Sequence, residues 1–426
     1  MIKQSLKKLS LVFFRIIVCI LIGTLLMTLV YLIPTKPIDN NVRKSAHIFK
    51  KEGKRPVLIN GVTSQCDNYT DALILLEAAN KNDKKILRSA MEVKEGNIGK
   101  LIPTDVLVNH YINNAPFTHQ HIYPRYWHGN LLVVKPLMSF VSYYGFRIIN
   151  SIIVLLTMVL VIWFLFKKNE KEFIAPYIIS MLFLMPLTIA FSIQLSSCFY
   201  VLNFGMIALL ATKNKASDKS RYIFLYIGIA TAFFDLLTYP IATFGVPCAL
   251  YLFMCGRKPL KYYFTKMLKA GILWGVGYAV MWFAKWLIAT CITDRNVFED
   301  AFVKVNTRTY AGVTATNKFT SIIETEKINI KYYLKTPAVF IALIYILIMI
   351  VLIIKQHQRI KDNIIFVVPF VALMLVPCAW YAIAAQHSSE HAWFTYKALV
   401  VLAISGLSIP AFLYKYNKKK EERSAI

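Results

Sequence analysis

The sequence predicts an all-α integral membrane protein with about ten transmembrane helices and a large first extracytoplasmic loop. Apolar residues of the AVILMFWYC set make up 57% of the 426 residues and charged residues only 17%, whereas soluble domains carry about 25% charged residues. Apolar runs of roughly the length that crosses a bilayer as a helix recur along the chain. Short clusters of Lys and Arg separate these runs, as is typical of membrane proteins.

The first apolar run extends from Leu9 to Pro34 and is the first predicted span. A signal peptide has an apolar region of only about 7 to 15 residues, followed by a small-residue cleavage site. This run is much longer, and no such site follows it. We therefore expect an uncleaved span whose N-terminus lies in the cytosol.

The remaining runs complete a single membrane domain, residues 1–426. The fifth and sixth runs share one apolar stretch, which Asp235 and Pro240 interrupt, so we expect a tight turn or a broken helix there. The ten spans are predicted at residues 9–34, 146–166, 174–194, 197–212, 222–236, 239–255, 271–292, 338–354, 364–385 and 397–414.

Positive charge predicts the orientation of the chain. Lys and Arg accumulate in the loops KKNEKE, KNKASDKSR, GRKPLKYYFTKMLK and KQHQRIKD and in the tail KYNKKKEER. By the positive-inside rule these segments face the cytosol, so we expect both termini to be cytoplasmic, in a multi-pass protein of the plasma (inner) membrane. Residues 35–128, residues 293–336 and the segment AQHSSEHAWFTY then share the extracytoplasmic face. The 35–128 loop also begins with basic residues, but long loops weigh little in this rule.

Charge and cysteine content narrow the classes of partner. The net charge of +27 does not indicate nucleic acid, because the basic residues lie mostly between spans; the lipid bilayer is the partner that this pattern predicts. The seven cysteines form no CxxC pair. We interpret them as small apolar side chains rather than as disulfides or metal ligands.

The first candidate site is CDNYTDALILLEAA, residues 66–79. Asp67 and Asp71 are four residues apart, so on one helix they would share a face and point into one space. The alternative is structural, because Asp is favoured at helix N-caps and in the first turn. Residues 72–79 are also apolar enough for a helix lying on the membrane. Local sequence does not decide between the two interpretations.

The second candidate is HIYPRYWHGNLLVVKPLMSFVSYYGFRIIN, residues 121–150, where aromatic and basic residues alternate. Tyr and Trp favour the membrane interface, so an aromatic belt with a short interfacial helix is one interpretation. In the other, Arg125, His128, Lys135 and Arg147 hold an anionic headgroup, because Arg matches phosphate bidentately. The spacing of the nearby histidines matches no standard metal-ligand set.

Two charged residues lie inside predicted spans. An ionisable group at membrane depth is costly and marks a functional site by default. Asp235, in FFDLLTYP, is a candidate site or gate residue. Lys285, between Trp282 and Trp286, is its expected partner. A structural ion pair is the alternative interpretation.

The later outer segments add basic groups. FEDAFVKVNTRTYAG places Arg308 at helical spacing with Glu299 and Asp300. This segment is either an exposed charged helix face or a phosphate site. In QHSSEHAWFTYKALVV, His387 and His391 are four residues apart. Histidine titrates near neutral pH, which suits proton transfer; two interfacial histidines with no role are the alternative.

Taken together, these stretches resemble the GT-C class of glycosyltransferases, in particular a branch of bacterial multi-span proteins found among envelope-polysaccharide genes. The resemblance covers nearly the whole chain and rests on the order of DNYTDALILLEAA, YPRYWHGNLLVVKPL, FFDLLTYPIATFGVP, GYAVMWFAKW and HSSEHAWFTYKAL. It implies a first outer loop with membrane-parallel helices and a polyprenyl-phosphate-linked sugar as the donor. The implied activity is transfer of that sugar to an envelope glycan or lipid acceptor on the extracytoplasmic face.

The resemblance also implies roles for particular residues. An acidic residue of the first loop, here Asp67 or Asp71, would be the general base. Many members carry an acidic doublet, whereas Asn68 follows Asp67 here. Which aspartate is the base, and whether a divalent metal (Mg or Mn) is needed, therefore stays open. The groups expected at the donor phosphate are Arg125, His128, Lys285, Arg308, His387 and His391. Those expected to contact the sugar or acceptor, or to act as a gate, are Tyr69, Trp127, Asp235 and Tyr239.

Three rival functions remain. A polysaccharide polymerase or ligase would usually carry one large late loop, whereas here the large loop comes first. A lipid or sugar transporter (flippase) would line a path through its bundle with polar residues and would not need a first-loop acid pair. A non-catalytic scaffold would leave the shared placement of acids, histidines and arginines unexplained.

Overall fold

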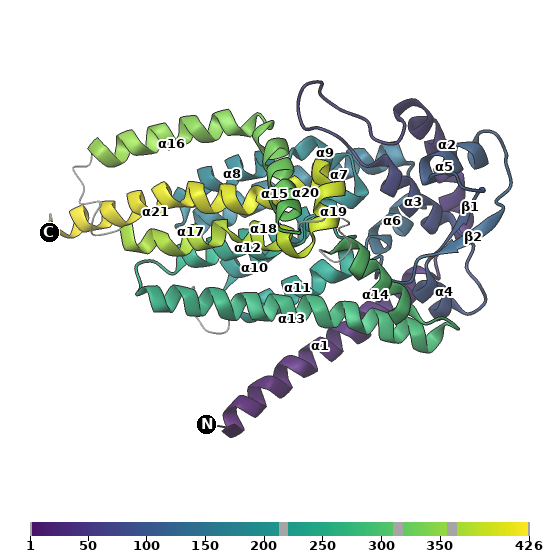
Figure 1. Ribbon diagram of the computed structural model, residues 1–426, viewed down its shortest axis with the longest axis horizontal. Coiled ribbons are helices and arrows are strands. Elements are labelled where there is room, and N and C mark those ends of the chain that lie inside the picture. Colours follow the sequence, from purple (N-terminus) through teal and green to yellow (C-terminus); the bar gives the residue numbers. More distant parts are fainter. Residues whose placement is uncertain (1, 213–219, 310–317, 356–363, 425–426) are drawn as a thin grey trace.

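The computed structural model describes residues 2–212, 220–309, 318–355 and 364–424. These residues form a bundle of long apolar helices and, at one end of it, a smaller assembly built from residues 35–122 (Figure 1). In the described part of the chain, the only sheet is one two-stranded ribbon. The all-α membrane class predicted from the sequence is therefore confirmed in its main feature.

Among the described residues, seven helical segments are long and apolar enough to cross a membrane. They are Leu9–Val30, Tyr143–Lys167, Ile193–Ala211, Leu260–Ile292, Ala338–Lys355, Ile364–Ile383 and Ala392–Tyr416. They correspond to α1 (Ile2–Val30), α7 (Tyr143–Lys167), α10 (Ile193–Ala211), α13 (Leu260–Ile292), α16 (Ala338–Lys355), η4 with α17 and α18 (Ile364–Val367, Val368–Met374, Val376–Ile383) and α20 with η5 and α21 (Ala392–Thr395, Tyr396–Leu399, Val400–Ser424). Two further apolar helices, α11 (Tyr222–Phe234) and α12 (Ile241–Met254), are shorter than a full crossing. The count of ten spans stays a prediction.

The third predicted span, residues 174–194, is not one helix. After the short η1 turn (Lys171–Phe173), α8 covers Ile174–Phe183 and α9 covers Pro186–Ala190. Between them, Met185 has a left-handed φ of 53°, which a continuous helix cannot contain. Pro186 also lacks the N–H that a helix interior requires, and its ring clashes with the preceding turn. This proline and the left-handed residue before it account for the break.

The predicted break at Asp235 and Pro240 is present, because α11 ends at Phe234 and α12 begins at Ile241. The expected ion pair of Asp235 with Lys285 is wrong. Asp235 accepts hydrogen bonds from the backbone N–H (3.0 Å) and the hydroxyl of Thr238, so it closes its own turn. Lys285 donates to the main-chain carbonyl of Met91 (2.8 Å).

Residues 35–122 fold around buried apolar side chains that continue into the bundle. This assembly comprises α2 (Thr35–Glu52), α3 (Asn68–Ala79), α4 (Ile86–Glu92), β1 (Lys94–Asn97), α5 (Pro103–Tyr111) and β2 (His119–Ile122). Every residue of α3 from Asp71 to Ala79 is buried. The expectation that residues 72–79 lie on the membrane surface is therefore wrong, because α3 is a central helix of the assembly.

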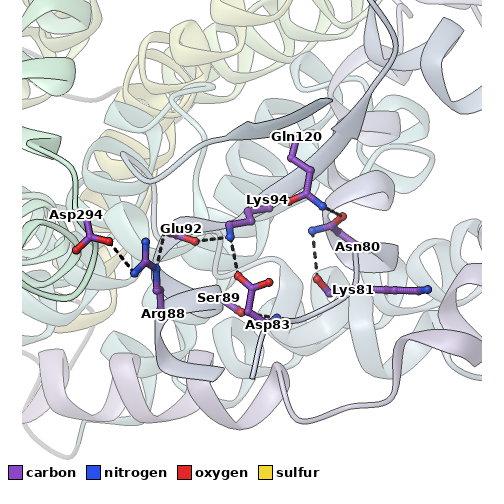
Figure 2. Close-up of polar contacts among 9 residues, drawn as sticks. All are labelled: Asn80, Lys81, Asp83, Arg88, Ser89, Glu92, Lys94, Gln120 and Asp294. Carbon is purple, nitrogen blue, oxygen red and sulfur yellow. Dashed lines mark hydrogen bonds and ion pairs between the residues drawn. The ribbon is translucent and has the colours of Figure 1, made fainter. Parts of the chain in front are cut away.

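Charged contacts hold this assembly against the bundle. Arg147 of α7 pairs with Glu52 of α2 through two hydrogen bonds (2.7 and 2.8 Å), and Asn68 of α3 bonds to both. Figure 2 shows a second connection, in which Arg88 of α4 reaches Asp294, just beyond α13 (2.9 Å). The first loop is thus connected to α7 and to the segment that follows α13.

The remaining helices lie around the junction of the two parts: α6 (Leu131–Met138), α14 (Val297–Arg308), α15 (Lys318–Leu334) and α19 (Ala385–Glu390). The first turn of α1 and the last turn of α21 lie far from the assembly of residues 35–122 (Figure 1). The predicted cytosolic loops KNKASDKSR and KQHQRIKD fall mostly outside the described residues, as does part of the predicted 293–336 loop.

Candidate functional site

A polar cavity of about 610 Å³ lies between the first loop and the segments around α14, α19 and α20. Predicted site residues from distant parts of the chain meet on its wall: Asp67, Tyr69, Arg125, Arg308, His387 and His391. The lining does not include the other predicted site residues, Asp71, Trp127, His128, Asp235, Tyr239 and Lys285. The cavity is therefore built by the tertiary fold from about half of the predicted set.

Asp67 is both a helix cap and a wall residue. It is the N-cap of α3, with φ −113° and ψ 71°. The Thr70 backbone N–H donates to its Oδ1 (3.2 Å) and the Thr70 hydroxyl to its Oδ2 (2.7 Å). Burial raises the pKa of Asp67, and the bonds from Thr70 act against this rise. The structural and the functional interpretation of this residue are thus compatible.

Asp71 has a different environment, fully buried and away from the cavity. It accepts hydrogen bonds from the hydroxyls of Tyr143 and Ser192 and from the backbone N–H groups of Ile193 (2.9 Å) and Gln194 (3.1 Å). Those two N–H groups open α10, so Asp71 caps a distant helix. Burial raises its pKa to about 7, against the hydrogen bonds that lower it.

Two arginines form the basic side of the cavity. The guanidinium of Arg125 lies over the ring of Tyr123 (4.7 Å to the centroid) and pairs with Asp300. Arg308, the last residue of α14, lies over the ring of Tyr126 (5.8 Å) and donates to its hydroxyl. The aromatic contacts orient both guanidinium groups, and the carboxylate of Asp300 also balances the charge of Arg125.

His387 and His391 stand side by side, with ring centroids 4.8 Å apart. Burial lowers the pKa of His387 to about 3, with the charges of Arg308 and His391 acting in the same direction. Burial and Arg308 also lower the pKa of His391. Both shifts favour the neutral form of the rings, and Arg308 supplies positive charge beside them. His387 Nε2 lies 2.7 Å from the carbonyl of Leu237, to which it donates.

Several predicted residues are instead bonded inside the protein. His128 lies against the carboxylate of Glu77 (3.1 Å). The others donate to main-chain carbonyls: Trp127, Lys135, Tyr239 and Lys285. All of them are buried. Their positions indicate support for the surrounding structure, and their proposed ligand contacts stay predictions.

The sequence interpretation missed part of the wall. Glu95 and His121 line the cavity and pair with each other (3.0 Å). They are far apart in sequence and meet only through the ribbon, so no local pattern indicates them. In the described structure, four buried polar atoms on the wall have no hydrogen-bond partner: Glu95 Oε2, Gln194 Oε1, His391 Nδ1 and Trp393 Nε1. Buried polar atoms are normally bonded, so this cluster indicates a place built to receive a polar ligand.

A second cavity, of about 580 Å³ and mainly apolar, adjoins the first. Its wall comes from α13, α14 and α18 and is rich in aromatic side chains, among them Tyr278, Trp282 and Trp286. Arg125 and Arg308 line both cavities. The two guanidinium groups therefore stand at the boundary between a polar and an apolar space.

Within the residues that the structure describes, no three His, Cys, Asp or Glu side chains gather closely enough to hold a metal ion. Mg²⁺ is usually held through carboxylate oxygens, and the Asp67 oxygens are engaged by Thr70. The wall as described does not form a cage for Mg or Mn.

No protein-family model, no curated protein and no solved structure matches the chain. Function is therefore inferred from the cavities themselves.

Proposed function

We propose that the protein is a membrane glycosyltransferase that moves a sugar from a polyprenyl-phosphate carrier to an envelope glycan or lipid acceptor on the extracytoplasmic face of the plasma membrane. The observation that carries this proposal is the junction of the two cavities at Arg125 and Arg308. An apolar space that meets a polar space at two cations fits a molecule with a long apolar tail and an anionic head.

Each part of such a donor has a counterpart. The prenyl chain packs against the aromatic side chains of the apolar cavity, such as Trp282. The phosphate lies between Arg125 and Arg308, because a guanidinium matches phosphate oxygens bidentately. The same groups stabilise the negative charge that develops on the leaving phosphate. The sugar then occupies the polar cavity, near Tyr69 and Trp393.

The acceptor hydroxyl must lose its proton as its oxygen attacks the sugar. General-base catalysis contributes typically about 10²–10⁴-fold to such a step. Of the two aspartates predicted for this role, Asp67 remains a candidate because it lines the cavity, whereas Asp71 is bonded to the start of α10. Glu95 and His121 stand on the same wall.

Arg308→Ala tests the proposal. The protein, purified in lipid nanodiscs, is incubated with polyprenyl-phosphate sugars and glycan or lipid acceptors, and the glycosylated product is measured. We expect the variant to lose about 10²–10³-fold in transfer rate, as for removal of one charge-stabilising donor. Lys84→Ala is the matched control, because Lys84 is an exposed cation of the first loop that lines neither cavity. Thermal unfolding confirms that both variants are folded.

Two outcomes contradict the proposal. A normal rate of sugar transfer by Arg308→Ala would show that Arg308 does not bind the donor phosphate. A wild-type protein that moves labelled polyprenyl-phosphate sugar between leaflets, and forms no glycosidic bond with any acceptor, would be a transporter of the same lipid.

A further inference from the structure

The ribbon of the first loop builds a carboxylate–imidazole pair on the wall of the polar cavity. Glu95 of β1 and His121 of β2 are directly opposite in the antiparallel register, where side chains on one face lie close enough to interact. His121 Nδ1 lies 3.0 Å from Glu95 Oε1. Both residues line the cavity that also contains Asp67 and Arg308.

The two members of the pair differ in exposure. Glu95 is 4% exposed, whereas half of the His121 side chain is accessible. Because Glu95 accepts the Nδ1 hydrogen, the neutral ring keeps its acceptor lone pair on Nε2. Among the described residues, no hydrogen bond engages Nε2. A carboxylate that fixes the tautomer and orientation of an imidazole, with the second nitrogen left for the reacting group, is the arrangement of a general base.

The surrounding charges suit this role. The hydrogen bond that His121 donates to Glu95 raises the pKa of His121, and the charge of Glu77 acts in the same direction, while burial and the charge of Arg125 lower it. The ring also borders an outer cavity whose other charged residues are Arg125, Arg295, Glu299 and Asp300. A proton taken up by Nε2 is thus stabilised by the buried carboxylate behind the ring.

Asp67 is less suited to take a proton from a substrate. It is 3% exposed. Both of its oxygens already accept hydrogen bonds from Thr70, at 3.2 and 2.7 Å. Its place at the N-cap of α3 makes these bonds part of the fold.

We propose that His121, oriented by Glu95, is the general base of the sugar transfer, while Asp67 shapes the acceptor side of the cavity; this rests on the proposed function. Nε2 takes the proton of the acceptor hydroxyl as that oxygen bonds to the anomeric carbon of the sugar. The bond from the anomeric carbon to the phosphate oxygen breaks, and its electron pair leaves with the polyprenyl phosphate. The imidazolium then gives its proton to water.

The test compares pH profiles of kcat/KM for the wild type, His121→Gln, Glu95→Gln and Asp67→Asn with a polyprenyl-phosphate sugar donor. In the wild type, kcat/KM rises with pH as the imidazole loses its proton. His121→Gln loses about 10²–10⁴-fold and no longer shows this rise. Glu95→Gln moves the rise to lower pH, because the bond that raises the imidazole pKa is weakened. His119→Gln is the matched control, an exposed histidine of the same strand that does not line the polar cavity, and it keeps the wild-type profile.

An independent readout is the NMR titration of His121 in protein labelled with ¹³C-histidine, where Glu95→Gln lowers the pKa of this ring and His119→Gln does not. An unchanged His121 titration in Glu95→Gln would overturn the pairing without any assay of catalysis. Two results would overturn the assignment of the base and leave the glycosyltransferase proposal standing. In one, His121→Gln keeps the wild-type pH profile of kcat/KM. In the other, Asp67→Asn is the only variant that loses the rise of kcat/KM with pH. A wild-type protein that transfers no sugar would overturn both.

Discussion

Asn68 lies between Glu52 and Arg147, and its side-chain amide forms a hydrogen bond with each of them. Its Nδ2 donates to Glu52 Oε2 and to the carbonyl of Gly53, each at 3.0 Å. Its Oδ1 accepts a bond from Arg147 (3.1 Å). Only a side chain with donors and an acceptor meets these demands. An aspartate here would offer no donor and would place a second carboxylate against Glu52, so the missing acidic doublet has a structural reason.

Asn68→Asp is therefore expected to destabilise the protein by about 1–3 kcal/mol, because it removes the donor to Glu52 and Gly53 and places a second, buried carboxylate beside that of Glu52. The measurement is the denaturant or thermal unfolding of the two proteins in the same nanodiscs. Asn306→Asp, an exposed residue of α14, is the control and should change stability little. Equal stability of Asn68→Asp and wild type would refute the role given to the amide.

The two aspartates show what sequence reasoning can predict at this scale. The rule that residues four apart share a helix face holds when both are helical. Asp67 is an N-cap with non-helical dihedral angles, so its side chain turns back to Thr70. Asp71 is helical, but it bonds to Ser192, Ile193 and Gln194, which no local pattern connects to it. The sequence could predict that an aspartate caps a helix here. It could not predict that Asp67, and not Asp71, lines the cavity.

At the scale of elements, α11 and α13 approach closely through glycines. A Cβ added at Gly228 would meet the carbonyl oxygen of Trp274, and one at Gly277 would meet the carbonyl oxygen of Leu225. Small residues allow helices in a membrane to pack backbone against backbone. This contact fixes the position of α13, whose C-terminal half lines the apolar cavity.

Gly228→Ala and Gly277→Ala should each lower stability by about 1–3 kcal/mol, because overpacking at this contact forces the backbones apart. Thermal unfolding in nanodiscs measures the change. Gly275 lies in the same helix with nothing within 4 Å of its added Cβ, so Gly275→Ala is the control and should be tolerated. If all three variants were equally stable, the close packing of α11 on α13 would be refuted.

The helices were largely predictable, because apolar runs between basic clusters locate them. The β1–β2 ribbon was not predictable. Its strands, KEGN and HQHI, are short and polar and show no alternation of apolar and polar residues. α3 packs against both β1 and α5, the helix that precedes β2, and local sequence does not express these contacts. The most chemically interesting pair on the cavity wall, Glu95 with His121, depends on this ribbon.

At the scale of the whole molecule, the termini and the first loop lie at opposite ends (Figure 1). α13 connects the two ends, from the basic segment before it to Asp294, which contacts the first loop in Figure 2. The described ends of the chain thus lie away from the first loop, and the side of the membrane that they face stays a prediction. The charge pattern predicts the sidedness of the chain, whereas the meeting of residues 67 and 391 in one cavity appears only in the fold.

Single cysteines in a background without native cysteines test the sidedness. A membrane-impermeant maleimide added to intact cells should label Lys84→Cys in the first loop and leave Lys261→Cys unlabelled until the membrane is permeabilised. Both positions are exposed, so a difference in labelling reports the compartment. The reverse pattern would place the cavity in the cytosol and contradict an extracytoplasmic donor.

The wall of the polar cavity also sets a condition on biogenesis. Its acidic side is made of residues 67–95 and its far side of residues 387–394, so a ribosome synthesises the two sides with nearly 300 residues between them. A chain that ends before residue 193 lacks the start of α10 that Asp71 caps, and one that ends before residue 387 lacks one wall of the cavity. We therefore expect a chain truncated before residue 387 to keep the buried apolar cluster of the first loop and to lack the complete polar cavity.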